Sequence, residues 1–113
     1  MITDPQQREE RVTWLRYEFA TAIERYKARE VTARELADIS SSLTVTGEVE
    51  ELGDELLQQV FWAMQHVLHR PACWAPTPQE IEYLLLCLRE EEIFDPEQIE
   101  FTYRPQPPAP GNG

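Results

Sequence analysis

Apolar side chains recur every three or four positions along four stretches of the 113-residue chain. This spacing places them on one face of an α-helix, because 3.6 residues complete a turn. The stretches cover about residues 5–29, 32–43, 48–69 and 78–95. The clearest helix start is Thr77-Pro78-Gln79-Glu80, where a capping box coincides with proline at the first helical position. The pattern therefore predicts an all-α fold, a four-helix bundle.

Local signals set the expected helix boundaries. Asp4-Pro5 favours the first start, and Thr32 with Glu35 three residues later forms a second capping box. Gly53 lies inside the expected third helix, where it costs about 1 kcal/mol relative to alanine. The fourth helix is expected to fail near Asp95-Pro96, because proline disfavours a helical conformation in the residue before it.

The chain length suits one hydrophobic core, so residues 1–103 are expected to form a single helical domain. Apolar and polar residues alternate over 99–103, and the segment 97–104 is expected either to pack on the bundle or to contact a partner. Residues 104–113 contain four of the nine prolines and little that a core would bury. They are expected to form a disordered, proline-rich tail.

The chain carries a strong excess of acidic residues. Twenty-one Asp and Glu against ten Lys and Arg give a formal net charge of -11. Residues 4–30 hold six acids and six bases, so the whole excess lies on the rest of the chain. Such a charge repels phosphate backbones and anionic lipid, and it attracts basic partners. We therefore expect a basic protein partner and no direct nucleic acid ligand.

Other features of the sequence indicate the compartment. No run approaches 18 consecutive apolar residues, and the first twenty residues contain four acids instead of the basic start and apolar stretch of an export signal. Two cysteines in such a chain are typical of reduced thiols and not of a disulfide framework. We expect a cytoplasmic protein that does not enter a membrane.

Two acidic clusters, at the start of the expected third helix and at the end of the fourth, are the candidate contact surface. The predicted partner-binding residues are Glu48, Glu50, Glu51, Asp54, Glu55, Glu90, Glu91, Glu92 and Trp74. A helix start stabilises carboxylates and a helix end disfavours them, so only the first cluster has a structural reason. A merely solvated acidic surface is the alternative for both clusters. For Trp74 the alternatives are a core position and an interface anchor.

Four residues are candidate ligands for a soft metal ion: His66, His69, Cys73 and Cys87. Their spacing matches no standard zinc finger or ribbon, and Cys87 lies among leucines, where a buried thiol is expected. The sequence contains no phosphate loop, no nucleophile elbow and no di-iron motif. We therefore expect no metal, no cofactor and no catalytic activity.

Three local features along residues 10–92 carry a resemblance to a known protein family. They are Phe19-x3-Ile23-x2-Tyr26 near the end of the first helix, Val31-Thr32-Ala33-x-Glu35-Leu36 at the entry to the second, and the acids of the third. In these features the chain resembles the small bacterial immunity proteins against nuclease toxins, most nearly the colicin D immunity type. The resemblance implies a cytoplasmic inhibitor whose carboxylates occupy the basic substrate groove of a tRNA-cleaving toxin domain.

Two functions therefore remain open at the level of the sequence. One is an acidic helical binding module, monomeric or homodimeric, that acts as an adaptor or inhibitor of a basic protein. The other is an immunity protein that neutralises a nuclease toxin. Recovery of a basic nuclease domain in a pull-down would separate them.

Overall fold

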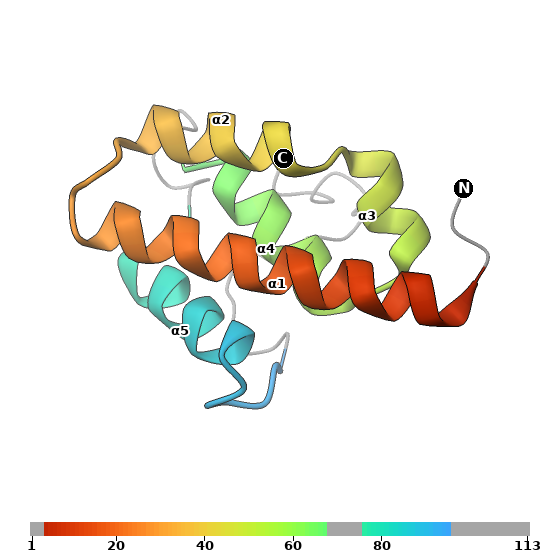
Figure 1. The fold of residues 1–113 in the computed structure, drawn as a ribbon. Helices are drawn as coiled ribbons and strands as arrows, with labels where there is room; N and C mark the ends of the chain where they lie inside the picture. The colour runs from red at the N-terminus through yellow and green to blue at the C-terminus, as the bar shows by residue number, and fades with distance from the viewer. Residues whose placement is uncertain (1–3, 68–75, 96–113) are drawn as a thin grey trace, which may run out of the picture.

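Five α-helices make up the part of the chain that the computed structural model describes, residues 4–67 and 76–95 (Figure 1). They are α1 (Pro5–Lys27), α2 (Ala33–Leu43), α3 (Thr46–Leu52), α4 (Glu55–Gln65) and α5 (Pro78–Leu88). These residues contain no strand, so the all-α prediction is confirmed for them. Trp74, the segment 97–104 and the expected tail 104–113 lie outside the described residues.

Side-chain caps start three of the helices as the sequence predicts. The Asp4 carboxylate accepts a hydrogen bond from a backbone amide in the first turn of α1 at 2.9 Å. At the start of α2, the Thr32 hydroxyl accepts from the Glu35 amide at 3.1 Å, and the Glu35 carboxylate accepts from the Thr32 amide at 2.8 Å. The same reciprocal pair between Thr77 and Glu80 starts α5. Both predicted capping boxes are therefore confirmed.

The predicted long third helix is wrong, because the chain breaks it at Gly53. This residue has φ +69°, a left-handed conformation that glycine adopts without steric cost, and it ends α3. Asp54 then starts α4, since its carboxylate accepts a hydrogen bond from the Leu57 amide at 2.9 Å. The described residues therefore form five helices in place of the expected four-helix bundle, and α4 ends at Gln65.

One residue in the left-handed region ends α1 and another ends α5. Arg29 has φ 63° and Glu90 has φ 61°. The Glu90 and Glu91 amides donate to carbonyls in the last turn of α5 at 3.0 and 2.9 Å, which is the Schellman arrangement. The expected end at Asp95-Pro96 is therefore wrong: α5 ends at Leu88. The acidic run that begins at Glu90 follows the helix and does not occupy its last turn.

The hydrophobic core forms around α1, which contacts α2, α4 and α5. Figure 1 shows α1 between α5 on one side and α2 and α3 on the other. The predicted apolar stripe of α1 is buried at Leu15, Phe19, Ala22 and Ile23 and partly buried at Val12 and Tyr26. The centroid of the Phe19 ring lies 6.5 Å from that of the Phe61 ring of α4. The largest fully buried side chains are Leu15, Phe19, Ile23, Leu36, Val49, Leu57, Val60, Met64 and Leu84.

Within the described residues, some large apolar side chains are exposed to solvent. Trp14 and Tyr17 flank the buried stripe of α1 and are 43% and 68% exposed. The Arg11 guanidinium lies over the Trp14 ring, 4.8 Å from its centroid. Among the described helices, none is long and apolar enough to span a membrane.

Candidate functional site

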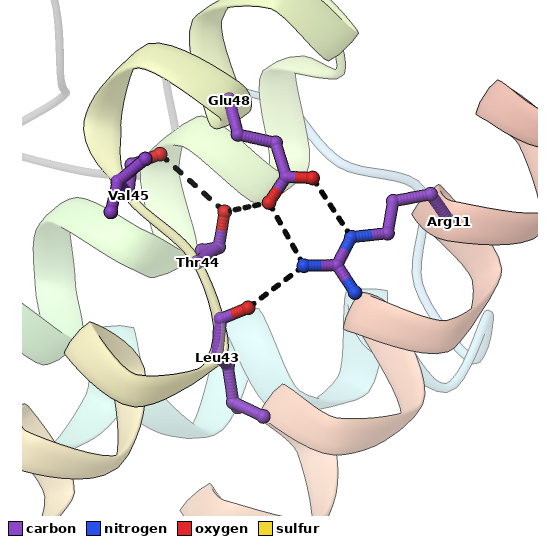
Figure 2. Close-up of polar contacts among 5 residues, drawn as sticks. All are labelled: Arg11, Leu43, Thr44, Val45 and Glu48. Atoms are coloured by element: carbon purple, nitrogen blue, oxygen red, sulfur yellow. Dashed lines mark hydrogen bonds and ion pairs between the residues drawn. The ribbon is translucent and has the colours of Figure 1, made fainter. Parts of the chain in front are cut away.

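Glu48, a predicted partner-binding residue, is bound inside the molecule by Arg11 of α1. Two hydrogen bonds of 2.9 Å join the guanidinium to the two carboxylate oxygens (Figure 2). The same guanidinium donates to the Leu43 carbonyl at 2.9 Å, and the Thr44 hydroxyl donates to the Glu48 carboxylate. A bidentate pair of this kind fixes geometry as well as charge. It fastens the end of α2 and the start of α3 to α1.

Two further arginines of α1 hold the junction between α3 and α4. Arg8 donates to the Leu52 carbonyl at 3.0 and 2.7 Å, which satisfies a backbone acceptor at the end of α3. Arg16 pairs with Asp54 at 2.7 Å. We call Arg8, Arg11 and Arg16 the arginine clamp. Because of this clamp, Glu48 and Asp54 face inward, toward α1.

The other three acids of the first predicted cluster lie on the outside of the same junction. Glu50 and Glu51 of α3 and Glu55 of α4 are all exposed. We call these three residues the acidic corner. The structure thus divides the predicted cluster: two carboxylates bind cations of α1, and the other three residues are exposed on the outside of the junction.

The second predicted cluster lies elsewhere on the molecule. Glu90, Glu91 and Glu92 are exposed in the turn that follows α5, on the opposite side of α1 from α3 (Figure 1). Glu90 and Glu91 border a groove of about 730 Å³ between α1 and the end of α5, together with Arg16 and Tyr17 of α1. The two acidic clusters are therefore not one surface, and a partner would have to contact them separately.

A small cavity opens between α3 and α4 next to the acidic corner. Its volume is about 150 Å³, and it is lined by Thr46, Val49, Glu50, Gln58, Phe61, Trp62, Gln65 and His66. The Trp62 and His66 rings stack, with centroids 4.6 Å apart, and His66 Nδ1 lies 2.8 Å from the Trp62 carbonyl oxygen. The break at Gly53 produces the angle between the two helices that line the cavity. Sequence patterning missed this cavity because it predicted one continuous helix there.

No group of three or more potential metal ligands converges within residues 4–67 and 76–95. His69 and Cys73 lie outside the described residues. Cys87 is buried, as its leucine-rich surroundings predict, and burial raises the pKa of its thiol. A raised pKa lowers the thiolate fraction and so makes Cys87 a poor nucleophile.

The stability contributed by Glu48 is expected to depend on pH. The hydrogen bonds from Arg11 hold the pKa of its carboxyl below the ordinary value, against the opposing effect of burial. A lowered pKa in the folded state stabilises the protein above the pKa of the unfolded chain, about 4.3, and this contribution is lost as the pH falls through the folded value. We expect Glu48→Gln to lower the free energy of unfolding by about 1–2 kcal/mol at pH 7 and by less at pH 3.

Urea denaturation of both proteins between pH 3 and 7 measures this difference. Glu55→Gln, which removes the same charge from the acidic corner, serves as the control for net charge. A loss of stability that stays constant from pH 7 to pH 3 would contradict the ionic role of Glu48.

No protein-family model matches this chain, and neither does any curated protein or solved structure. The resemblance to immunity proteins therefore rests on the chain's own residues. Of these, Phe19 and Ile23 are core residues, and Thr32 and Glu35 form a helix cap.

Proposed function

We propose that the protein is a non-catalytic, acidic binding module that docks on a basic protein and acts as its inhibitor or adaptor. The observation that carries this proposal is how charge divides at the α3–α4 junction. Glu48 and Asp54 bind the arginine clamp, whereas the acidic corner is exposed. Three of the five acids of the first cluster are therefore exposed, on a chain whose formal net charge is -11.

The physical consequence is attraction of a basic surface over a distance. A surface of one sign raises the rate of encounter with a partner of the opposite sign, and this effect weakens as salt increases. The corner is also held firmly, because the clamp joins α3 to α1 on its other side. The backbone that carries the corner therefore loses little conformational entropy on binding, and only its glutamate side chains have to be ordered.

A nuclease toxin domain is one specific partner with the required charge. Its substrate groove binds phosphates, so it presents cations that carboxylates can neutralise. This version of the proposal follows the resemblance to immunity proteins. A pull-down with the protein as bait tests it: recovery of a basic nuclease supports an immunity role, and recovery of a different basic protein supports an adaptor or another inhibitor.

Neutralising the acidic corner is expected to slow association with the recovered partner. In the variant Glu50→Gln/Glu51→Gln/Glu55→Gln, we expect the association rate at low salt to fall about three- to tenfold, with a smaller change in the dissociation rate. The wild-type rate should fall with added salt more steeply than that of the variant. Stopped-flow mixing at several salt concentrations measures both effects.

The matched control is Glu9→Gln/Glu10→Gln/Asp38→Asn, which removes three charges from exposed positions on α1 and α2. It separates a local effect of the corner from an effect of net charge. Equal association rates for the two triple variants would remove the acidic corner from the contact surface. Thermal denaturation should show that the corner variant stays within about 0.5 kcal/mol of the wild type, because its substitutions are on the surface.

A further inference from the structure

The cavity between α3 and α4 shares a residue with the acidic corner. Glu50 belongs to both: it is exposed, and it lines the cavity together with Val49 of the same helix. From α4 the cavity receives Phe61 and Trp62. Its volume of about 150 Å³ suits one small group of the size of a benzene ring. It can therefore hold one side chain of a partner that docks on the corner.

We infer that this cavity receives an arginine side chain of the basic partner. The inference rests on the proposed function, since it names the group by which that partner is recognised. A guanidinium with its methylene stem combines an apolar body, a flat cation and hydrogen-bond donors without acceptors. The lining offers the matching groups: Val49 and Phe61 for the stem, the Trp62 ring for the flat cation, and the Glu50 carboxylate for the charge.

Gln65 of the lining also favours a ligand that donates hydrogen bonds. The Gln65 side-chain nitrogen donates to the Ser40 hydroxyl at 2.5 Å and to the Ser41 hydroxyl at 2.8 Å. Because α2 holds that nitrogen, Gln65 can contact a ligand in the cavity through its side-chain oxygen. Gln58 and Thr46 add side chains to the lining that can accept hydrogen bonds as well as donate them.

Other side chains fit this lining less well. A phenyl or leucyl group would fill the volume but would offer the Glu50 carboxylate neither an opposite charge nor a hydrogen-bond donor. A lysine ammonium carries the charge but has neither the flat face that stacks on Trp62 nor the forked donors that pair with a carboxylate. Arginine satisfies both requirements.

The first test uses a defined probe, N-acetyl-arginine methylamide, titrated into the full chain and followed by NMR. We expect a saturable shift of the Trp62 indole signal. That signal is assigned by its absence from the spectrum of Trp62→Phe. The citrulline counterpart has nearly the same shape without the charge, and it should bind about fivefold more weakly. The Glu50→Gln variant should bind the arginine probe more weakly by a similar factor. Equal binding of the two probes, or shifts that avoid the cavity residues, would overturn the inference.

The second test separates this inference from the proposed function. Gln58→Phe fills the cavity without changing the charge, and Gln79→Phe makes the same change on the exposed face of α5. If an arginine enters the cavity, Gln58→Phe raises the dissociation constant for the basic partner at least tenfold and Gln79→Phe leaves it unchanged. If the corner variant weakens binding and Gln58→Phe does not, the inference fails while the proposed function stands. If neither variant affects binding, both fail.

Discussion

Replacing Phe19 by alanine is expected to lower the free energy of unfolding by about 3–5 kcal/mol. Phe19 is fully buried in the middle of α1, and its ring forms a stacked pair with the Phe61 ring of α4. The substitution removes a large apolar surface and leaves a cavity between two helices that the protein cannot close without moving α1. For a domain of this size, a loss of this magnitude is a large share of the total stability.

Urea denaturation followed by circular dichroism measures the loss. Tyr17→Ala is the matched control, because Tyr17 is an aromatic residue on the same helix that is 68% exposed. It should change the free energy of unfolding by no more than about 0.5 kcal/mol. Similar losses for the two variants would mean that α1 does not bury the face described above.

Replacing Asp54 by alanine is expected to lower the free energy of unfolding by about 2–3 kcal/mol. This carboxylate has two roles, since it caps α4 through the Leu57 amide and pairs with Arg16. Loss of a helix cap costs about 1 kcal/mol. Loss of the ion pair adds to this, because the side chain of Asp54 is only 16% exposed and Arg16, at 32% exposed, would keep a partly desolvated charge without its partner.

The Asp54→Asn variant separates the two roles. Asparagine caps helices about as well as aspartate, but it carries no charge. We therefore expect thermal denaturation to show that the stability of Asp54→Asn lies between that of the wild type and that of Asp54→Ala. If the asparagine variant is as stable as the wild type, the pair with Arg16 contributes nothing, and the clamp is weaker than its geometry indicates.

The sequence predicts the starts of α1, α2 and α5 because each depends on residues close together in the chain. The capping box of Thr32 and Glu35 needs only four consecutive residues, and the same holds for Thr77 and Glu80. Leu84, on the apolar stripe of the best-delimited helix, is fully buried as that stripe predicts. Where a short segment contains both partners of an interaction, the pattern is sufficient.

The break at Gly53 could not be read from the apolar pattern. Val49 and Leu52 before it and Leu56 and Val60 after it keep three- and four-residue steps, so the periodicity continues through the break. The local signal was present in Gly53 and Asp54, which are a preferred helix end and a preferred helix cap. Periodicity outweighed this signal because one glycine costs a helix only about 1 kcal/mol.

The sequence could not predict which acids of the first cluster bind α1, and the reason is different. Glu48 and Asp54 look the same as Glu50 and Glu51 in the sequence, as carboxylates near a helix start. Only their pairing with α1 distinguishes them, and those partners are 37 and 38 residues away. Spacing rules describe neighbours within a helix, so they do not predict which face of α3 turns to another helix.

The sequence separation between the arginines of the clamp and their partners affects how the chain folds during its synthesis. Synthesis proceeds from α1 onward, so Arg8, Arg11 and Arg16 precede their partners by 44, 37 and 38 residues. At ordinary rates of translation this delay is about 2–9 s. Of the helices that contact α1, only α2 is completed during it, because α4 and α5 come later in the chain. The segment 4–30 is also neutral, so α1 itself does not contribute the charge repulsion that keeps the finished molecule apart from its copies.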